Sequence, residues 1–176
     1  MKYAVIVIDV QQGLFVSEAP AFVESTIKNI NLVTDKARKL DVPVIFIHHT
    51  RSDCGLASGS DAWQIVKEVS VHLDDLHIEK STPDSFLNTS LQDELVARGV
   101  TDLAICGYAT EFCVDTTVRR AAALKYNVTL IADAHTTHDK PHASAEWVRS
   151  HHNATLPEVT SFEGDITLSD AEDIFI

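Results

Sequence analysis

The chain has 176 residues and a formal charge of −12, with 26 acidic residues against 14 lysines and arginines. Nucleic-acid-binding proteins usually carry a basic surface, so this charge argues against a nucleic-acid partner. An apolar content of 45% and a charged content of 23% are those of an ordinary globular protein. Domains typically hold about 100–200 residues, so the length predicts one domain that spans residues 1–176.

The apolar pattern alternates strands with helices along the chain. Short runs of apolar and β-branched residues indicate buried strands, and apolar residues three or four positions apart indicate helices. The predicted strands are residues 3–8, 44–47, 77–80, 103–106, 128–132 and 159–162. The predicted helices are residues 20–40, 91–98, 114–124 and 143–152. This pattern predicts an α/β fold, a doubly wound six-stranded parallel sheet in the order 3-2-1-4-5-6 with helices on both faces.

The N-terminus and the cysteines indicate a cellular compartment. The segment Met1 to Asp9 is apolar over too short a span for a signal peptide, and no apolar run reaches the length of a membrane span. The three cysteines, Cys54, Cys106 and Cys113, form no regular framework, which suits a reducing compartment and leaves a thiol free for chemistry. The sequence therefore predicts a cytoplasmic protein with no membrane partner.

The stretch Gly107 to Asp115 lies between a predicted strand and a predicted helix. Thr110 fits the N-cap of that helix, so Cys113 falls in its first turn. Free backbone amides and the helix dipole favour negative charge there, so we expect the Cys113 thiol to ionise more easily than in bulk water. The same amides are suited to an oxyanion. Cys113 is therefore the candidate nucleophile, whereas Cys106 lies inside a strand and is expected to belong to the core.

Two charged residues are expected beside Cys113. Ligands of doubly wound sheets bind at the carboxyl ends of the strands, and Asp9 and Lys80 follow or end the first and third predicted strands. In this arrangement Cys113 attacks, Asp9 takes its proton and later gives it to the leaving group, and Lys80 stabilises the thiolate. A simpler interpretation stays open, in which Asp9 forms a turn and Lys80 is a solvated surface residue.

Four segments together carry a resemblance to a known family. They are Ile8-Asp9-Val10-Gln11, Lys80 with Asp84-Ser85-Phe86, Gly107-Tyr108-Ala109-Thr110-Glu111-Phe112-Cys113-Val114, and Ala132-Asp133-Ala134. The chain resembles the isochorismatase-like cysteine hydrolases over nearly its whole length. The resemblance implies a catalytic triad of Asp9, Lys80 and Cys113, an oxyanion hole formed by the amides of Ala109 and Cys113, and a cis peptide bond between Tyr108 and Ala109.

The resemblance also implies an activity, the hydrolysis of a C–N bond in a small amide or carbamoyl compound through a Cys113 thioester. Isochorismatase itself cleaves a vinyl ether without a nucleophilic cysteine, so Cys113 indicates the amidohydrolase branch. Nicotinamidases of the family add a metal site with an Asp-x-His pair after the second strand, which the segment His48-His49-Thr50-Arg51 lacks. The implied enzyme needs no metal and no cofactor and forms a homodimer or homotetramer. A nicotinamidase-type activity stays open.

Substrate-binding residues are expected around the same rim. The candidates are Phe15, His49, Trp63, Tyr108 and Phe112, although such aromatic residues also fit an ordinary core.

Three alternatives stay open. The first is a non-catalytic small-molecule-binding relative, which would have no need of a complete triad. The second is a thiol redox protein that uses Cys106 and Cys113, which lack a C-x-x-C motif. The third open question is structural: the acidic tail from Ser169 to Ile176 could dock on a neighbouring subunit or pack on its own domain.

Overall fold

The computed structural model describes residues 1–15 and 18–175. Its six strands form one parallel sheet in the order β3-β2-β1-β4-β5-β6, which confirms the predicted topology. The strands are β1 (Tyr3–Ile8), β2 (Val44–His49), β3 (Leu76–Lys80), β4 (Asp102–Tyr108), β5 (Asn127–Thr136) and β6 (Ile166–Ser169).

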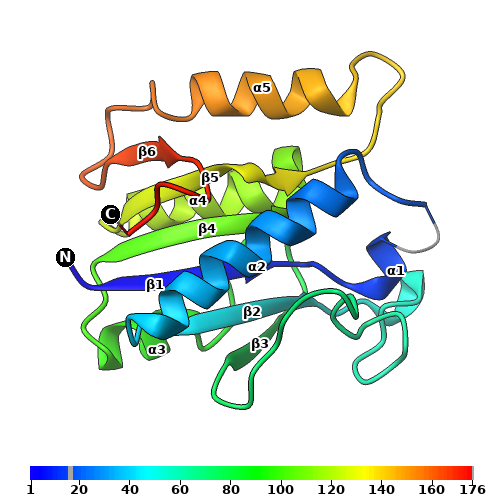
Figure 1. Cartoon of the computed structure of the whole chain (residues 1–176), viewed down its shortest axis with the longest axis horizontal. Helices are drawn as coiled ribbons and strands as arrows, with labels where there is room; N and C mark the ends of the chain where they lie inside the picture. The colour runs from blue at the N-terminus through cyan, green and yellow to red at the C-terminus, as the bar shows by residue number, and fades with distance from the viewer. Residues whose placement is uncertain (16–17, 176) are drawn as a thin grey trace.

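Helices cover both faces of the sheet. They are α1 (Gln12–Phe15), α2 (Val23–Lys39), α3 (Leu91–Ala97), α4 (Asp115–Ala123) and α5 (Ala145–Thr155), with a 3-10 turn at Ser52–Cys54 and a π-helical turn at Thr110–Val114. Figure 1 shows α2 in front of the sheet and α4 behind it. The π-helical turn lies between β4 and α4, in the stretch that the sequence analysis singled out.

Strand β1 divides the core into two layers. Ala4, Ile6 and Ile8 pack with residues of α3 and α4, whereas Val5 and Val7 pack with residues of α2. All five side chains are fully buried. Because successive side chains of a strand point to opposite faces, the register of each strand decides which layer its last residue reaches.

The sequence prediction was wrong at the last strand. Val159 and Phe162 pack against the core from an irregular segment, and β6 pairs with β5 through Ile166 to Ser169 instead. An apolar pattern reports burial, which a loop can provide without strand pairing. β6 is an edge strand whose Thr167 and Leu168 are exposed, so it carries little apolar signal.

The C-terminal tail packs on its own chain. Ala171 and Ile174 are buried in the layer of α2, and the Lys36 ammonium of α2 donates to the Ala171 carbonyl at 3.2 Å. Phe175 meets the ring of Tyr3 edge-on at 5.2 Å. These contacts support the alternative in which the tail packs on its own domain, while residue 176 lies outside the described part. Among the described residues, no helix has the length and apolar character that crossing a membrane requires.

Candidate active site

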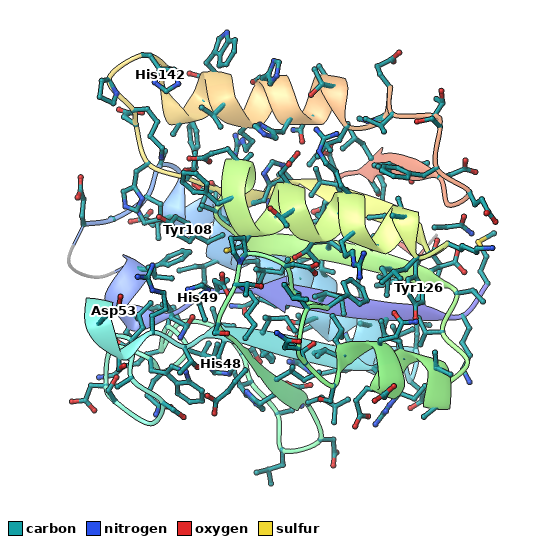
Figure 2. All side chains as sticks on the ribbon, turned by 180° about the vertical axis from the view of Figure 1, so that it is seen from behind. His48, His49, Asp53, Tyr108, Tyr126 and His142 are labelled. Carbon is teal, nitrogen blue, oxygen red and sulfur yellow. The ribbon has the colours of Figure 1, made fainter. Side chains whose placement is uncertain are left out.

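The carboxyl ends of β1, β3 and β4 meet at one rim of the sheet. β1 pairs with β2 and with β4, and β2 pairs with β3. Lys80 Nζ lies 2.7 Å from Asp9 Oδ2 and 3.3 Å from Cys113 Sγ. His49 and Tyr108 mark this rim in Figure 2. The structure therefore brings together the three residues that the sequence predicted as a triad.

Asp9 leaves the strand conformation directly after β1. Its φ of +52° lies in the left-handed region, which aspartate tolerates better than most residues. Its side chain is 2% exposed. Oδ2 accepts a hydrogen bond from Lys80, and Oδ1 is buried without a partner among the described residues. Since buried polar atoms are nearly always paired, Oδ1 is an acceptor available for a proton or a substrate group.

The ammonium of Lys80 is the centre of the site. Its side chain is fully buried at the end of β3. Besides Asp9 and Cys113, Nζ contacts His49 Nδ1 at 3.0 Å and the Thr82 carbonyl at 3.1 Å. An ammonium has only three hydrogens, so these four groups share them. The positive charge of Lys80 offsets the buried negative charge of Asp9.

Cys113 lies in the π-helical turn Thr110–Val114. The prediction that Thr110 caps this helix was wrong, because Ala109 takes the N-cap position and no side chain binds the free amides there. The peptide bond between Tyr108 and Ala109 is cis. Cys113 itself is half-buried, and it is the most open of the three triad residues.

The Thr110 hydroxyl binds a buried histidine instead of capping the helix. Thr110 Oγ1 lies 2.9 Å from His135 Nδ1, and His135 Nε2 lies 2.8 Å from Asn153 Oδ1. Because the Asn153 oxygen only accepts, His135 carries its proton on Nε2, and its Nδ1 accepts from the Thr110 hydroxyl. Burial lowers the pKa of His135 to about 4. A neutral His135 therefore ties the Cys113 turn to β5 and α5.

We expect His135 to make the protein less stable as the pH falls from 6.5 towards about 4. In this range the unfolded chain binds a proton on the ring and the folded protein does not. The free energy of unfolding therefore falls by about 1.4 kcal/mol per pH unit from this group. Urea titrations at several pH values measure the slope. His135→Gln has no proton to gain, so an unchanged slope in that variant would contradict the assignment.

The thiol of Cys113 is hard to ionise in the resting protein. Burial and then the negative charge of Asp9 raise its pKa to about 12, although Lys80 acts in the opposite direction. The expectation of an easily ionised thiol was therefore wrong. It considered only the helix amides, whereas loss of water and a neighbouring carboxylate outweigh them. Cys113 rests as a thiol beside a carboxylate.

Gln11 is a site residue to which the sequence analysis gave no role. It is fully buried, and its side-chain oxygen accepts from the His49 amide at 2.8 Å. Its side-chain nitrogen donates to the carbonyls of His49 and Trp63 at 3.1 and 2.9 Å. The available signals were its place in the segment Ile8 to Gln11 and, for His135, its place in the histidine-rich turn after the fifth predicted strand.

Trp63 closes the loop that follows β2. Its ring stacks on His48 at 4.1 Å, and its Nε1 donates to Thr50 Oγ1 at 2.8 Å. The hydroxyls of Thr50 and Ser58 donate to the Glu79 carboxylate at 2.8 and 2.9 Å. β3 therefore binds this loop through Glu79, and its next residue, Lys80, contacts Asp9 and Cys113.

The other aromatic candidates for substrate binding lie in two different parts of the site, one buried and one at the surface. Phe15 is buried and meets Tyr108 edge-on at 5.5 Å, and the Tyr108 hydroxyl lies 3.0 Å from His138 Nδ1. Phe112 is instead 54% exposed, with the Lys140 ammonium 5.6 Å from its ring centre. The structure therefore groups Phe15 with Tyr108 and leaves Phe112 at the surface.

Asp9, His49 and Cys113 also form a cluster of potential metal ligands. One ligand atom of each lies within 4.8 Å of the other two. The Lys80 ammonium lies within 3.3 Å of an atom of each residue. The place of a metal ion among these three residues is thus taken by a cation of the protein itself.

Cys106 and Cys113 are both free thiols. Cys106 is buried in the layer of α2, whereas Cys113 packs against the layer of α3 and α4. The sheet separates the two layers, and a disulfide needs Cα atoms within about 7 Å and side chains that point toward each other. The arrangement gives no support to a redox function of this pair.

A family model described as the isochorismatase domain matches residues 3–160. The chain belongs to the isochorismatase family. A crystal structure of another isochorismatase family protein has a TM-score of 0.87 and 30% identity, covering 96% of this chain and 98% of that one. The family resemblance and the fold class are both confirmed.

Two curated relatives of this isochorismatase-family chain carry named activities. A streptothricin hydrolase of Streptomyces noursei is 33% identical over 143 residues, which are 80% of this chain and 51% of that protein. The ureidoacrylate amidohydrolase RutB of Caulobacter segnis is 34% identical over 109 residues, which are 62% of this chain and 42% of that protein. The matched part is about half the length of these relatives.

Proposed function

We propose that this protein is a cysteine hydrolase that cleaves the C–N bond of a small amide or carbamoyl-type compound. One observation carries the proposal: the buried Lys80 ammonium contacts the carboxylate of Asp9 and the sulfur of Cys113 together. This contact supplies a base, a nucleophile and the cation that balances charge during transfer of a proton. The amidohydrolase among the relatives supports a C–N bond as the target.

The first half of the reaction forms a thioester. The Cys113 sulfur attacks the carbonyl carbon of the substrate while its proton passes to the Asp9 carboxylate. We assign stabilisation of the resulting oxyanion to the backbone amides of Ala109 and Cys113. Asp9 then returns the proton to the nitrogen, the C–N bond breaks, and ammonia or an amine leaves. The raised pKa of Cys113 favours this coupled transfer over attack by a preformed thiolate.

The second half of the reaction releases the acid. Asp9 takes a proton from a water molecule, whose oxygen attacks the thioester carbon. The C–S bond then breaks, and the Cys113 sulfur recovers a proton from Asp9. Lys80 keeps its positive charge throughout and stabilises whichever of Asp9 and Cys113 is negative. The net reaction consumes one water and needs no redox partner.

Mass spectrometry of the intact protein tests the proposal. The protein is incubated briefly with a panel of primary amides, N-carbamoyl compounds and nicotinamide, and ammonia release is measured in parallel. We expect a transient acyl adduct and ammonia with the wild type and neither with Cys113→Ala. Cys106→Ala removes a buried thiol outside the site and is expected to keep both signals. Ammonia release by Cys113→Ala at the wild-type rate would overturn the proposal.

A further inference from the structure

His49 forms the more open side of the charged cluster. Its side chain is 16% exposed, whereas those of Asp9 and Lys80 are 2% and 0% exposed. It ends β2 and contacts Lys80, and Figure 2 shows it at the same rim as Tyr108. A potential ligand atom of His49 lies within 4.8 Å of that of Cys113. A group bound to the Cys113 sulfur would therefore lie next to this ring.

The contact with Lys80 determines which ring nitrogen of His49 carries the proton. An ammonium only donates hydrogen bonds, so His49 Nδ1, at 3.0 Å from Lys80 Nζ, is the acceptor. Burial and then the charge of Lys80 lower the pKa of His49, with Asp9 acting in the opposite direction. A neutral ring that accepts at Nδ1 carries its hydrogen on Nε2.

The Nε2 atom of His49 has no hydrogen-bond partner among the described residues. The other histidines near the rim use both ring nitrogens: His48 contacts Trp63 O and His77, and His138 contacts Tyr108 and Glu18 O. The Nε2–H group of His49 is thus available to donate a hydrogen bond, whereas both ring nitrogens of His48 and of His138 already have partners.

Gln11 holds the backbone of His49 in place from the buried side. Its side chain both accepts from the His49 amide and donates to the His49 carbonyl, and it also donates to the carbonyl of Trp63. One fully buried amide therefore fixes the end of β2 relative to the loop that Trp63 closes. This brace fixes the backbone from which the His49 ring extends.

We propose that His49 is a neutral Nε2–H donor to the substrate, oriented by Lys80 and positioned by Gln11. The substrate class follows from this donor. It consists of amides with a second hydrogen-bond acceptor, such as another carbonyl oxygen, close to the carbonyl that Cys113 attacks. This substrate class rests on the proposed function, whereas the tautomer of His49 does not.

NMR of the protein with ¹⁵N-labelled histidine tests the donor without any turnover. We expect the neutral Nε2–H tautomer for His49 at pH 7, assigned by its loss in His49→Gln. In Cys113→Ala, malonamide is expected to shift the His49 Nε2 signal. Isovaleramide, which has the same number of heavy atoms but an apolar isopropyl group in place of the second carboxamide, is expected to leave it in place. A neutral Nδ1–H ring, a charged ring, or equal shifts with both amides would each overturn the proposal.

Kinetics with the same two amides test the consequence for the reaction. His49→Leu is expected to lower kcat/KM about tenfold more for malonamide than for isovaleramide, because only malonamide loses a hydrogen bond to the substrate while the lost contact with Lys80 affects both amides. His49→Gln keeps an acceptor and a donor and is expected to restore most of the difference. His72→Leu, on the exposed surface, serves as the matched control. Equal losses on the two amides in His49→Leu would assign the residue a purely structural role.

The positioning role of Gln11 has its own readout. Gln11→Met removes the brace at similar size, and the selectivity between the two amides is expected to fall about as far as in His49→Leu. Full selectivity in a folded Gln11→Met variant would overturn this role. If the wild type hydrolyses neither amides nor N-carbamoyl compounds, the proposed function fails, and the NMR measurements still decide the state of His49.

Discussion

Replacing Lys80 by methionine is expected to lower the free energy of unfolding by about 3–5 kcal/mol, because it leaves a buried carboxylate without its cation. The side chains of Asp9 and Lys80 are 2% and 0% exposed, so water cannot replace the lost partner. Urea denaturation measures this loss. Hydrolysis is expected to fall about 10³-fold, since the charge that balances the Cys113 sulfur during attack is lost as well.

Two comparisons make the Lys80 result specific. The double variant Asp9→Asn, Lys80→Met removes both charges and is expected to recover most of the stability while remaining inactive. Lys125→Met breaks an ion pair with Glu163 whose side chains are 67% and 72% exposed, and its cost should stay within about 1 kcal/mol. Equal costs for Lys80→Met and Lys125→Met would contradict a buried, charge-balanced triad.

Gly107→Ala is expected to destabilise the protein by about 4 kcal/mol. Gly107 has a φ of +119°, and a Cβ there would lie 2.2 Å from the Ile8 carbonyl oxygen. The strained conformation costs about 1–3 kcal/mol and the overpacking a similar amount. β1 and β4 pair at Ile8 and Gly107, so the strands would separate directly before Asp9 and the Cys113 turn. Thermal or urea denaturation together with an activity assay measures both effects.

Gly59→Ala separates conformational strain from the close approach. Gly59 also has a positive φ, +79°, but a Cβ there would meet no atom within 4 Å. Only the left-handed conformation is then penalised, at about 1–2 kcal/mol. If the two alanine variants cost the same, the contact between Gly107 and Ile8 does not explain the glycine.

The sequence was sufficient for the sheet order and for the proximity of Asp9, Lys80 and Cys113. Buried parallel strands appear as short apolar runs, and connection rules restrict the order in which they pair. Asp9 and Lys80 stand at strand ends, where topology alone brings side chains together. The position of the sixth strand was mispredicted because β6 lies at an exposed edge and has few buried apolar residues. Val159 and Phe162 are apolar because they pack against the core from a loop.

The sequence was insufficient wherever a property depends on distant neighbours. The pKa of Cys113 depends on burial and on Asp9, which are set by the folded chain and not by the helix start. The role of Gln11 arises from contacts with residues 38 and 52 positions away. Thr110 satisfies the rule for an N-cap, yet a buried His135 offered its hydroxyl a better-shielded partner.

Strand β3 assigns two tasks to two adjacent residues. Glu79 binds the hydroxyls of Thr50 and Ser58 in the loop after β2, and Lys80 contacts Asp9 and Cys113. Because neighbouring strand residues point to opposite faces, the two side chains have separate partners. The loop is nevertheless linked to Lys80 as well, since the Thr50 amide donates to the Lys80 carbonyl at 2.8 Å. Directed evolution of this loop should therefore keep the residues that bind β3. A library that varies the loop between these two hydroxyls and keeps Thr50 and Ser58 is expected to retain both hydrogen bonds to Glu79 and the contacts of Lys80 with Asp9 and Cys113.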